Sequence, residues 1–293
     1  MTISGSIFAA LLTPFNEDGS ISIRGIAPLV DYILSKGVHG LYASGSTGES
    51  ILQSRDERAE HLTALADYAR GKCTLFAHVG AASTGEAEFL AAPAKEQGYD
   101  AVSAVPPYYY RHGFDDMSGD SKAIADAADL PVVSSMIRAL SGAEFSTDKL
   151  VELMVDPRIA GAKFTAQDLF QFQQLRKRAP GKKFYFGTDE MFLGAAAMGA
   201  DGGIGSTYNL IGDVYLGIEQ AVRDGNISDA RSLQEKANDL IAILLQTGVM
   251  PGLKHAFNQM GIPVGPCRAP FSPPSSGPLK DLDRWLSENG YVR

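Results

Sequence analysis

The stretch Ile159-Ala160-Gly161-Ala162-Lys163-Phe164 is a short apolar run in which Lys163 carries the only charge. A run of this kind is typical of a buried strand in an α/β protein. Because burying an ammonium group is costly unless it is paired or neutralised, most lysines lie on solvated helix faces instead. The carboxyl ends of such strands open onto active sites, so Lys163 is either a catalytic residue or an ordinary lysine at a strand end.

Similar runs occur on both sides of this stretch and alternate with helical patterns. The predicted strands are Ile7–Leu12, Gly40–Ala43, Thr74–Val79, Ala101–Val105, Val132–Ile137, Ile159–Lys163, Phe184–Gly187 and Gly203–Ser206. The helical patterns include Ile23–Ser35, Asp56–Arg70, Glu86–Gln97, Ser121–Ala128, Asp168–Arg178 and Glu190–Met198. Eight strands, each followed by a helix, predict a (β/α)8 barrel, with a doubly wound sheet as the alternative.

Local signals support these limits. Ser54 and Glu57 have the spacing of a capping box, and Gly37 and Gly98 follow predicted helices where terminal glycines are expected. After the eighth strand the pattern becomes helical. We therefore predict a barrel domain over residues 1–210 and a helical extension over residues 211–293, which packs on the barrel or forms an oligomer interface.

Composition limits the function. The chain has 293 residues, of which 45% are hydrophobic and 20% charged, as in a globular protein with a full core. The net charge of −8 argues against nucleic-acid or anionic-membrane partners. Cys73 and Cys267 have no metal or redox spacing. With neither a signal peptide nor a bilayer-long apolar run in sight, we expect a cytosolic protein.

The segment after the second predicted strand, Ser44–Ser50, places two glycines around two hydroxyls. Backbone N–H and side-chain O–H groups can converge there on one anion. The loop is too short for a nucleotide P-loop and lacks its lysine, so a small carboxylate fits better. A plain polar turn is the alternative reading.

Two further loops follow the seventh and eighth strands. Asp201–Asn209 is rich in glycine and polar residues, so it could bind phosphate or simply allow close packing of strand and helix. Gly187-Thr188-Asp189-Glu190 brings two carboxylates to the barrel mouth, although acidic residues at a helix start are commonly caps.

Taken together, these motifs resemble the dihydrodipicolinate synthase/N-acetylneuraminate lyase family. The resemblance rests on Gly45–Glu49, the lysine strand, Pro107-Tyr108-Tyr109, Ala139-Leu140-Ser141-Gly142, and the segments from Gly187 to Asn209. The motifs occur in the family order over nearly the whole chain.

The resemblance implies a barrel enzyme, usually a homotetramer built as a dimer of dimers, that needs no cofactor or metal. Lys163 would form a Schiff base with a 2-keto acid such as pyruvate. Ser46 and Thr47, with Gly48 beside them, would hold the pyruvoyl carboxylate and join a proton relay. Tyr109 would reach into a neighbouring subunit's site, and Ile204 would supply a backbone contact.

The residue types suit this chemistry. An amine attacks a carbonyl only when neutral, and an unperturbed lysine is neutral in roughly one molecule in 2,500 at pH 7. Burial at an apolar strand end lowers the lysine pKa and raises that fraction. The resulting iminium is an electron sink, so a C–C bond can break or form without a metal, while hydroxyls move the protons.

The chain departs from the family pattern in its fifth strand. The family's proton-shuttling tyrosine aligns with Ser135, whose hydroxyl is shorter and less acidic. We therefore predict that a water held by Ser134, Ser135 or Tyr110 takes over the relay. Arg138 replaces the usual proline, where it binds an acidic substrate group or forms a surface salt bridge.

The resemblance favours the lyase branch over the synthase branch. An arginine that binds the second substrate in the synthases is replaced by Leu140. In the lyases, the positions of Gly187, Asp189, Glu190 and Ser206 bind the polyol part of a sugar acid. We predict a pyruvate aldolase or lyase for a 2-keto-3-deoxy sugar acid. The alternatives are a dihydrodipicolinate synthase, a catalytically weakened keto-acid sensor and a phosphosugar barrel.

Overall fold

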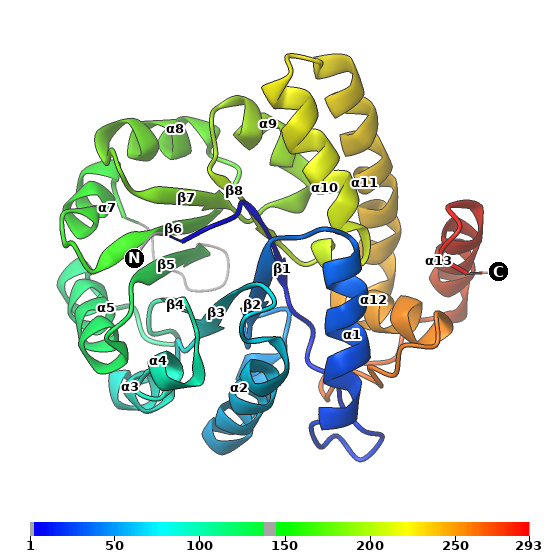
Figure 1. Ribbon diagram of the computed structural model, residues 1–293, viewed down its shortest axis with the longest axis horizontal. Coiled ribbons are helices and arrows are strands. Elements are labelled where there is room, and N and C mark those ends of the chain that lie inside the picture. The colour runs from blue at the N-terminus through cyan, green and yellow to red at the C-terminus, as the bar shows by residue number, and fades with distance from the viewer. Residues whose placement is uncertain (1–2, 138–144, 293) are drawn as a thin grey trace.

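The computed structural model describes residues 3–137 and 145–292. Over these residues, eight parallel strands close into one barrel in the order β1 to β8, surrounded by helices (Figure 1). The strands are β1 (Ile7–Ala10), β2 (Gly40–Ala43), β3 (Thr74–His78), β4 (Ala101–Ala104), β5 (Val132–Ile137), β6 (Ile159–Thr165), β7 (Lys183–Phe186) and β8 (Gly202–Gly205). Because β1 pairs with β8, the predicted (β/α)8 barrel is confirmed and the doubly wound sheet is wrong.

Helices cover the outside of the barrel. They are α1 (Ile23–Ser35), α2 (Arg55–Ala69), α3 (Thr84–Ala91), α4 (Ala94–Gln97), α5 (Phe114–Ala128), α7 (Thr147–Met154), α8 (Leu169–Arg178), α9 (Phe192–Ala197) and α10 (Tyr208–Arg223), with the 3-10 helices η1 (Ser50–Leu52) and η2 (Asp189–Met191).

Most helices match the predicted ranges, and the differences have local causes. The predicted helix Glu86–Gln97 is divided into α3 and α4 at Pro93, which has no N–H to continue a helix. The predicted helix Glu190–Met198 begins as η2 and continues as α9. The capping box is confirmed: Ser54 Oγ accepts from Glu57 N at 3.2 Å, and Glu57 Oε2 accepts from Ser54 N at 2.8 Å.

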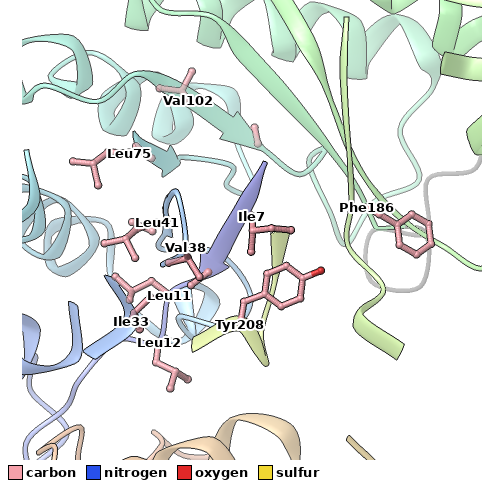
Figure 2. Close-up of a cluster of buried hydrophobic side chains, with 14 of the residues drawn as sticks. Ile7, Leu11, Leu12, Ile33, Val38, Leu41, Leu75, Val102, Phe186 and Tyr208 are labelled. Carbon is pink, nitrogen blue, oxygen red and sulfur yellow. The ribbon is translucent and has the colours of Figure 1, made fainter. Parts of the chain in front are cut away.

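Side chains alternate between the barrel interior and its helix-facing side, as the period of a strand requires. Inside, the Phe8 ring packs edge to face on Phe76 at 4.9 Å and on Tyr185 at 5.3 Å between ring centroids. Their strand neighbours Ile7 and Leu75 point outward into the larger core under the helices (Figure 2). The barrel is thus a packed core rather than a channel.

The chain continues into α11 (Ile227–Thr247), α12 (Val249–Gln259) and α13 (Ser276–Glu288). Helix α11 runs beside α10, and its Leu240 and Leu244 belong to the same core cluster as Ile7 (Figure 1). The predicted packing of the extension on the barrel is therefore present. The proposed domain boundary after residue 210 falls inside α10 and stays a prediction.

Within the described part of the chain, no single helix has both the length and the apolar character needed to cross a membrane. The pair α11 and α12 has them together, but the two helices are bent by 107° relative to each other.

Candidate active site

Lys163 lies on β6 in the barrel mouth. Its partners in the sheet register are Ser135 on β5 and Tyr185 on β7. Residues in register on parallel strands point their side chains to the same face, so all three point into the barrel. Only 8% of Lys163 is exposed. The lysine is thus an inward-facing, buried group rather than a solvated one.

Gly187 gives the Lys163 side chain its space. A Cβ on Gly187 would lie 2.9 Å from Lys163 Cε and 2.1 Å from Thr165 Oγ1, both shorter than a van der Waals contact. The predicted contact of Gly187 with substrate remains a prediction. Independently of that contact, the position has no room for a side chain.

The barrel makes the protonated Lys163 side chain more acidic than that of an ordinary lysine. Burial lowers its pKa to about 8, against the opposing effect of the Asp189 carboxylate. At pH 7 a group with this pKa is neutral in about one molecule in ten, compared with roughly one in 2,500 for an ordinary lysine. The amine is therefore suited to attack a carbonyl.

Two buried hydroxyls share the face of the barrel wall on which Lys163 lies. Thr165 Oγ1 has no hydrogen-bond partner among the described residues. Ser135 Oγ lies near the Tyr42 hydroxyl, whose ionised form it favours. Buried polar atoms are nearly always bonded to protein, water or ligand, so Thr165 is available to a bound molecule or an ordered water. Ser134 alternates with Ser135 and faces the helices, so it is not placed to hold a water beside Lys163.

Tyr42 on β2 also lies beside the amine, with its ring centroid 4.9 Å from Lys163 Nζ. Its hydroxyl is 2.8 Å from Ser103 Oγ, which donates to the Val133 carbonyl at 2.6 Å. Tyr42 therefore donates to Ser103, and the chain ends at a carbonyl that cannot pass a proton on. Burial raises the Tyr42 pKa to about 12, against the lowering effects of Ser103 and Ser135, so Tyr42 is a neutral phenol that presents its ring to the amine.

The segment 44–50, called here the strand-two loop, places its hydroxyls at the mouth. Thr47 is buried and Ser46 is exposed. Thr47 Oγ1 lies 2.7 Å from Ser206 Oγ, which follows β8. The Gly48 carbonyl accepts from Thr13 Oγ1 at 2.8 Å and from Gln53 Nε2 at 2.6 Å. The loop is therefore held in a fixed shape next to the predicted polyol region.

A buried ion pair ties the strand-two loop to the C-terminal extension. Glu49, at a positive φ of 56°, forms an ion pair of 2.7 Å with Lys254 on α12, and both side chains are almost fully buried. Glu49 Oε2 also accepts from the backbone N–H of Arg268 at 2.8 Å. Lys254 lies over the Phe15 ring at 4.1 Å and donates to the Pro266 carbonyl at 2.9 Å.

The segment 187–191, called here the strand-seven turn, carries the two predicted carboxylates. Asp189 is buried, and its Oδ2 accepts from Thr207 N at 2.9 Å and from Thr207 Oγ1 at 2.7 Å. Burial raises the pKa of Asp189, while the Thr207 donors and Lys163 act in the opposite direction. Glu190 is exposed. Asp189 therefore bonds Thr207 at the start of α10. The alternative reading expected it to cap the helix that begins at its own position, and within the part of the chain that the structure describes no side-chain cap is found there.

Two further predicted residues lie at different depths. Ile204 is fully buried on β8, in register with Phe8 on β1. Tyr109 is 90% exposed and has a positive φ of 82°, which is unusual for an aromatic residue. The described residues of one chain thus leave Tyr109 outside the mouth.

Arg138 and the turn from Ala139 to Gly142 lie outside the described residues, so their predicted roles stay predictions. Among the residues brought together around Lys163, sequence reasoning missed Tyr42 and Thr165. Thr165 could have been found, since it lies two positions after Lys163 on the same strand and so shares its face. Tyr42 gave no signal beyond that of a buried strand residue.

Within residues 3–137 and 145–292, no group of three or more His, Cys, Asp or Glu side chains could hold a metal ion.

Comparison with known proteins identifies the family of this chain. Residues 3–289 match the model of the dihydrodipicolinate synthetase family. The chain is 44% identical over 269 residues to the N-acetylneuraminate lyase of Salmonella typhimurium, covering 91% of each protein.

Two solved structures have the same fold over nearly their full length. CdNal from Clostridium difficile in complex with mannosamine has a TM-score of 0.94 and 33% identity, covering 98% of this chain and 99% of that chain. A catalytic lysine mutant of the Ruminococcus gnavus sialic acid aldolase has a TM-score of 0.93 and 26% identity, covering 98% of each chain.

Proposed function

This chain belongs to the dihydrodipicolinate synthetase family, and we propose that it uses Lys163 to cleave or form a bond to pyruvate in a sialic-acid-like 2-keto-3-deoxy sugar acid. It is a lyase of the class I aldolase type, in a family that works without a cofactor. The observation that carries the role of Lys163 is its buried position in the mouth, with a pKa lowered to about 8.

The reaction begins with the neutral Lys163 amine. Its lone pair attacks the C2 carbonyl of the keto acid, and loss of water from the adduct leaves an iminium. The Ser46 and Thr47 hydroxyls of the strand-two loop hold the carboxylate of the keto acid. The contribution of Gly48 stays a prediction, since its N–H donates to the Gly45 carbonyl at 3.0 Å. The Tyr42 ring beside Nζ favours the cationic iminium, since an aromatic face attracts a positive charge.

Cleavage follows from the electron demand of the iminium. A base removes the proton of the C4 hydroxyl, the C3–C4 bond breaks, and its electron pair moves into the iminium to form an enamine. The aldehyde leaves, C3 takes up a proton, and water hydrolyses the new iminium to release pyruvate and the amine. The water lost in the first half is thus regained in the second.

The proton steps need a hydroxyl or water near C3 and C4. Ser135 and Thr165 point into the mouth with buried oxygens. Thr165 Oγ1 has no partner among the described residues, and Ser135 Oγ lies near the Tyr42 hydroxyl. We assign them a water that takes the place of the missing tyrosine. Of the three residues predicted to hold this water, the assignment keeps Ser135. It leaves out Ser134, which faces the helices, and Tyr110, which is 71% exposed, and it adds Thr165.

The substrate class rests on the relatives and on the strand-seven turn. The lyase and aldolase relatives have names that refer to N-acetylneuraminate or sialic acid. Asp189, Glu190 and Ser206 offer carboxylate and hydroxyl groups to the hydroxyls of such a chain. Dihydrodipicolinate synthesis remains the less favoured alternative.

We propose a homotetramer located in the cytosol. Support for the assembly comes from Tyr109, which is 90% exposed at a positive φ in the single chain. A second copy of the chain could bury this exposed aromatic side chain. Tyr109 would then approach the active site of that second copy.

Borohydride reduction in the presence of pyruvate tests the proposal. We expect a covalent pyruvate adduct on the peptide that contains Lys163, and none after Lys163→Arg. Lys254 provides an internal control, since it is also buried but paired with Glu49. An adduct on another peptide, or no adduct in the folded wild type, would overturn the proposed role of Lys163.

A second candidate, a keto-acid sensor with little turnover, is favoured by Ser135 in the tyrosine position. Turnover of a panel of 2-keto sugar acids separates it from the lyase, because a sensor would trap pyruvate but cleave none of them. If the serine limits turnover, Ser135→Tyr should raise kcat about tenfold or more, whereas Ser135→Phe should not.

A further inference from the structure

Helix α11 in the C-terminal extension holds the strand-seven turn through two amide side chains. Gln234 is 7% exposed; its Oε1 accepts from Leu193 N at 2.8 Å and its Nε2 donates to the Asp189 carbonyl at 3.1 Å. Nε2 also donates to Asn238 Oδ1 at 3.0 Å. Asn238 Nδ2 donates to the Glu190 carbonyl at 3.3 Å. The two amide side chains thus donate to the backbone carbonyls of Asp189 and Glu190, the two acidic residues of the turn.

The turn depends on such support. Its 3-10 helix η2 has three residues, too few to be stable alone, because one hydrogen-bonded turn does not repay the cost of nucleation. In contrast, α11 has 21 residues, and its apolar face is buried in the main core. The position of the turn is therefore set by the longer helix.

A second support acts on the Asp189 side chain. Tyr215 Oη on α10 lies 2.7 Å from Thr207 Oγ1. Because Thr207 gives its own proton to Asp189 Oδ2, Tyr215 is the donor to Thr207. Asp189 Oδ2 is thus occupied by two Thr207 donors, and Oδ1 lies against Gly205, where an added Cβ would be only 2.2 Å away. The backbone and the carboxylate of Asp189 are fixed from two different helices.

None of these bonds reaches the keto-acid end of the mouth. The bonds of Gln234 and Asn238 go to residues 189, 190 and 193, whereas the strand-two loop is fixed by Glu49, Lys254 and Arg268. Loosening the α11 contacts should therefore displace the polyol region. Its effect on Schiff-base formation should be limited to a small change in the Lys163 pKa, which the Asp189 carboxylate raises against the effect of burial.

We propose that Gln234 and Asn238 are positioning residues that set the preference of the site for long sugar acids, by holding Asp189 and Glu190 at the height of the substrate's outer hydroxyls. This inference rests on the proposed function. It assigns a role in substrate selectivity to a helix that lies outside the barrel and touches neither Lys163 nor the strand-two loop.

The test compares a nine-carbon with a six-carbon 2-keto-3-deoxy acid. Asn238→Ala and Gln234→Leu should raise KM for the nine-carbon acid about tenfold, because a small displacement of a binding group is felt strongly. The kinetics of the six-carbon acid and reductive trapping of pyruvate should stay within about twofold of wild type. Asn238 is only partly buried, so its variant decides the test if Gln234→Leu fails to fold.

Asn258→Ala is the matched control. Asn258 on α12 also clamps a loop by its amide, accepting from Val264 N at 3.1 Å and donating to the Gly265 carbonyl at 3.1 Å. This variant should leave the ratio of the two acids unchanged. Equal losses on both acids, no change on either, or a wild type that cleaves only the six-carbon acid would overturn the inference. A wild type that traps no pyruvate would instead overturn the proposed function.

Discussion

The strand-two loop follows β2 and the strand-seven turn follows β7 at the mouth of the barrel, and both are bonded to C-terminal helices. They differ in the kind of bond that fixes them. The loop depends on a buried ion pair of 2.7 Å between Glu49 and Lys254, whereas the turn depends on the neutral amides of Gln234 and Asn238. The loop is assigned to the keto-acid part of the substrate and the turn to the sugar chain, and the kind of bond in each region suits that assignment.

The two kinds of bond differ in how readily the residues that form them can be substituted. Removing one member of a buried ion pair leaves an unpaired charge, so either partner alone is hard to replace. Removing one neutral amide bond costs far less. Substitutions among the residues that fix the keto-acid region are therefore strongly destabilising. Substitutions among those that fix the sugar-chain region cost less, so the sequence there can change more easily.

The largest expected effect comes from breaking the ion pair. Glu49→Gln leaves the Lys254 ammonium buried without a counter-charge, which should lower the free energy of unfolding by about 3–5 kcal/mol. Chemical denaturation measures this loss. The double variant Glu49→Gln/Lys254→Met removes both charges and should regain much of the stability. A single variant within about 1 kcal/mol of wild type would mean that the loop does not depend on this pair.

A pH profile of pyruvate trapping measures the Lys163 amine at the keto-acid end of the site. Because burial lowers the Lys163 pKa to about 8, the neutral fraction should rise about tenfold per pH unit below 8 and level off above it. The initial rate of reductive trapping, at fixed pyruvate, measures this fraction. A rate that kept rising beyond pH 10 would indicate an ordinary lysine.

The same lowered pKa affects stability with a definite sign. Between the folded value near 8 and the ordinary value of 10.5, the unfolded chain binds more protons at Lys163 than the folded chain does. The contribution of this residue to stability therefore improves as the pH rises through that interval. Below pH 8 its burial is a constant cost.

The smallest expected effect comes from the outer support of Asp189. Tyr215→Phe removes the hydroxyl that donates to Thr207, so the carboxylate loses part of its orientation. We expect KM for a nine-carbon acid to rise about fivefold, the equivalent of one hydrogen bond, with trapping of pyruvate unchanged. The control Tyr99→Phe removes another buried hydroxyl, which donates to the Leu62 carbonyl. It should change neither the KM for the nine-carbon acid nor the trapping of pyruvate. A fall in trapping after Tyr215→Phe would contradict the separation of the two regions.

The sequence was sufficient for the barrel because short apolar runs and helix caps are local signals. Lys163 stood out for the same reason, as a charge in an apolar run. The supports described above could not be predicted in this way. Gln234 and Asn238 look like ordinary polar residues of an amphipathic helix, and their partners lie more than forty positions away in the chain. Pro93 is a local sequence signal for a helix break between α3 and α4. The helical pattern on both sides of it led to the prediction of one continuous helix.

Gly187 constrains the order in which mutations can accumulate at this site. A Cβ there would come too close to Lys163 Cε and to the Thr165 hydroxyl at once, so both side chains would have to move. A descendant could gain a side chain at 187 only after Thr165 had already become smaller, and even then the lysine would have to bend away. Substitutions on two neighbouring strands are thereby linked, and the reactive amine is protected from gradual change on its β7 side.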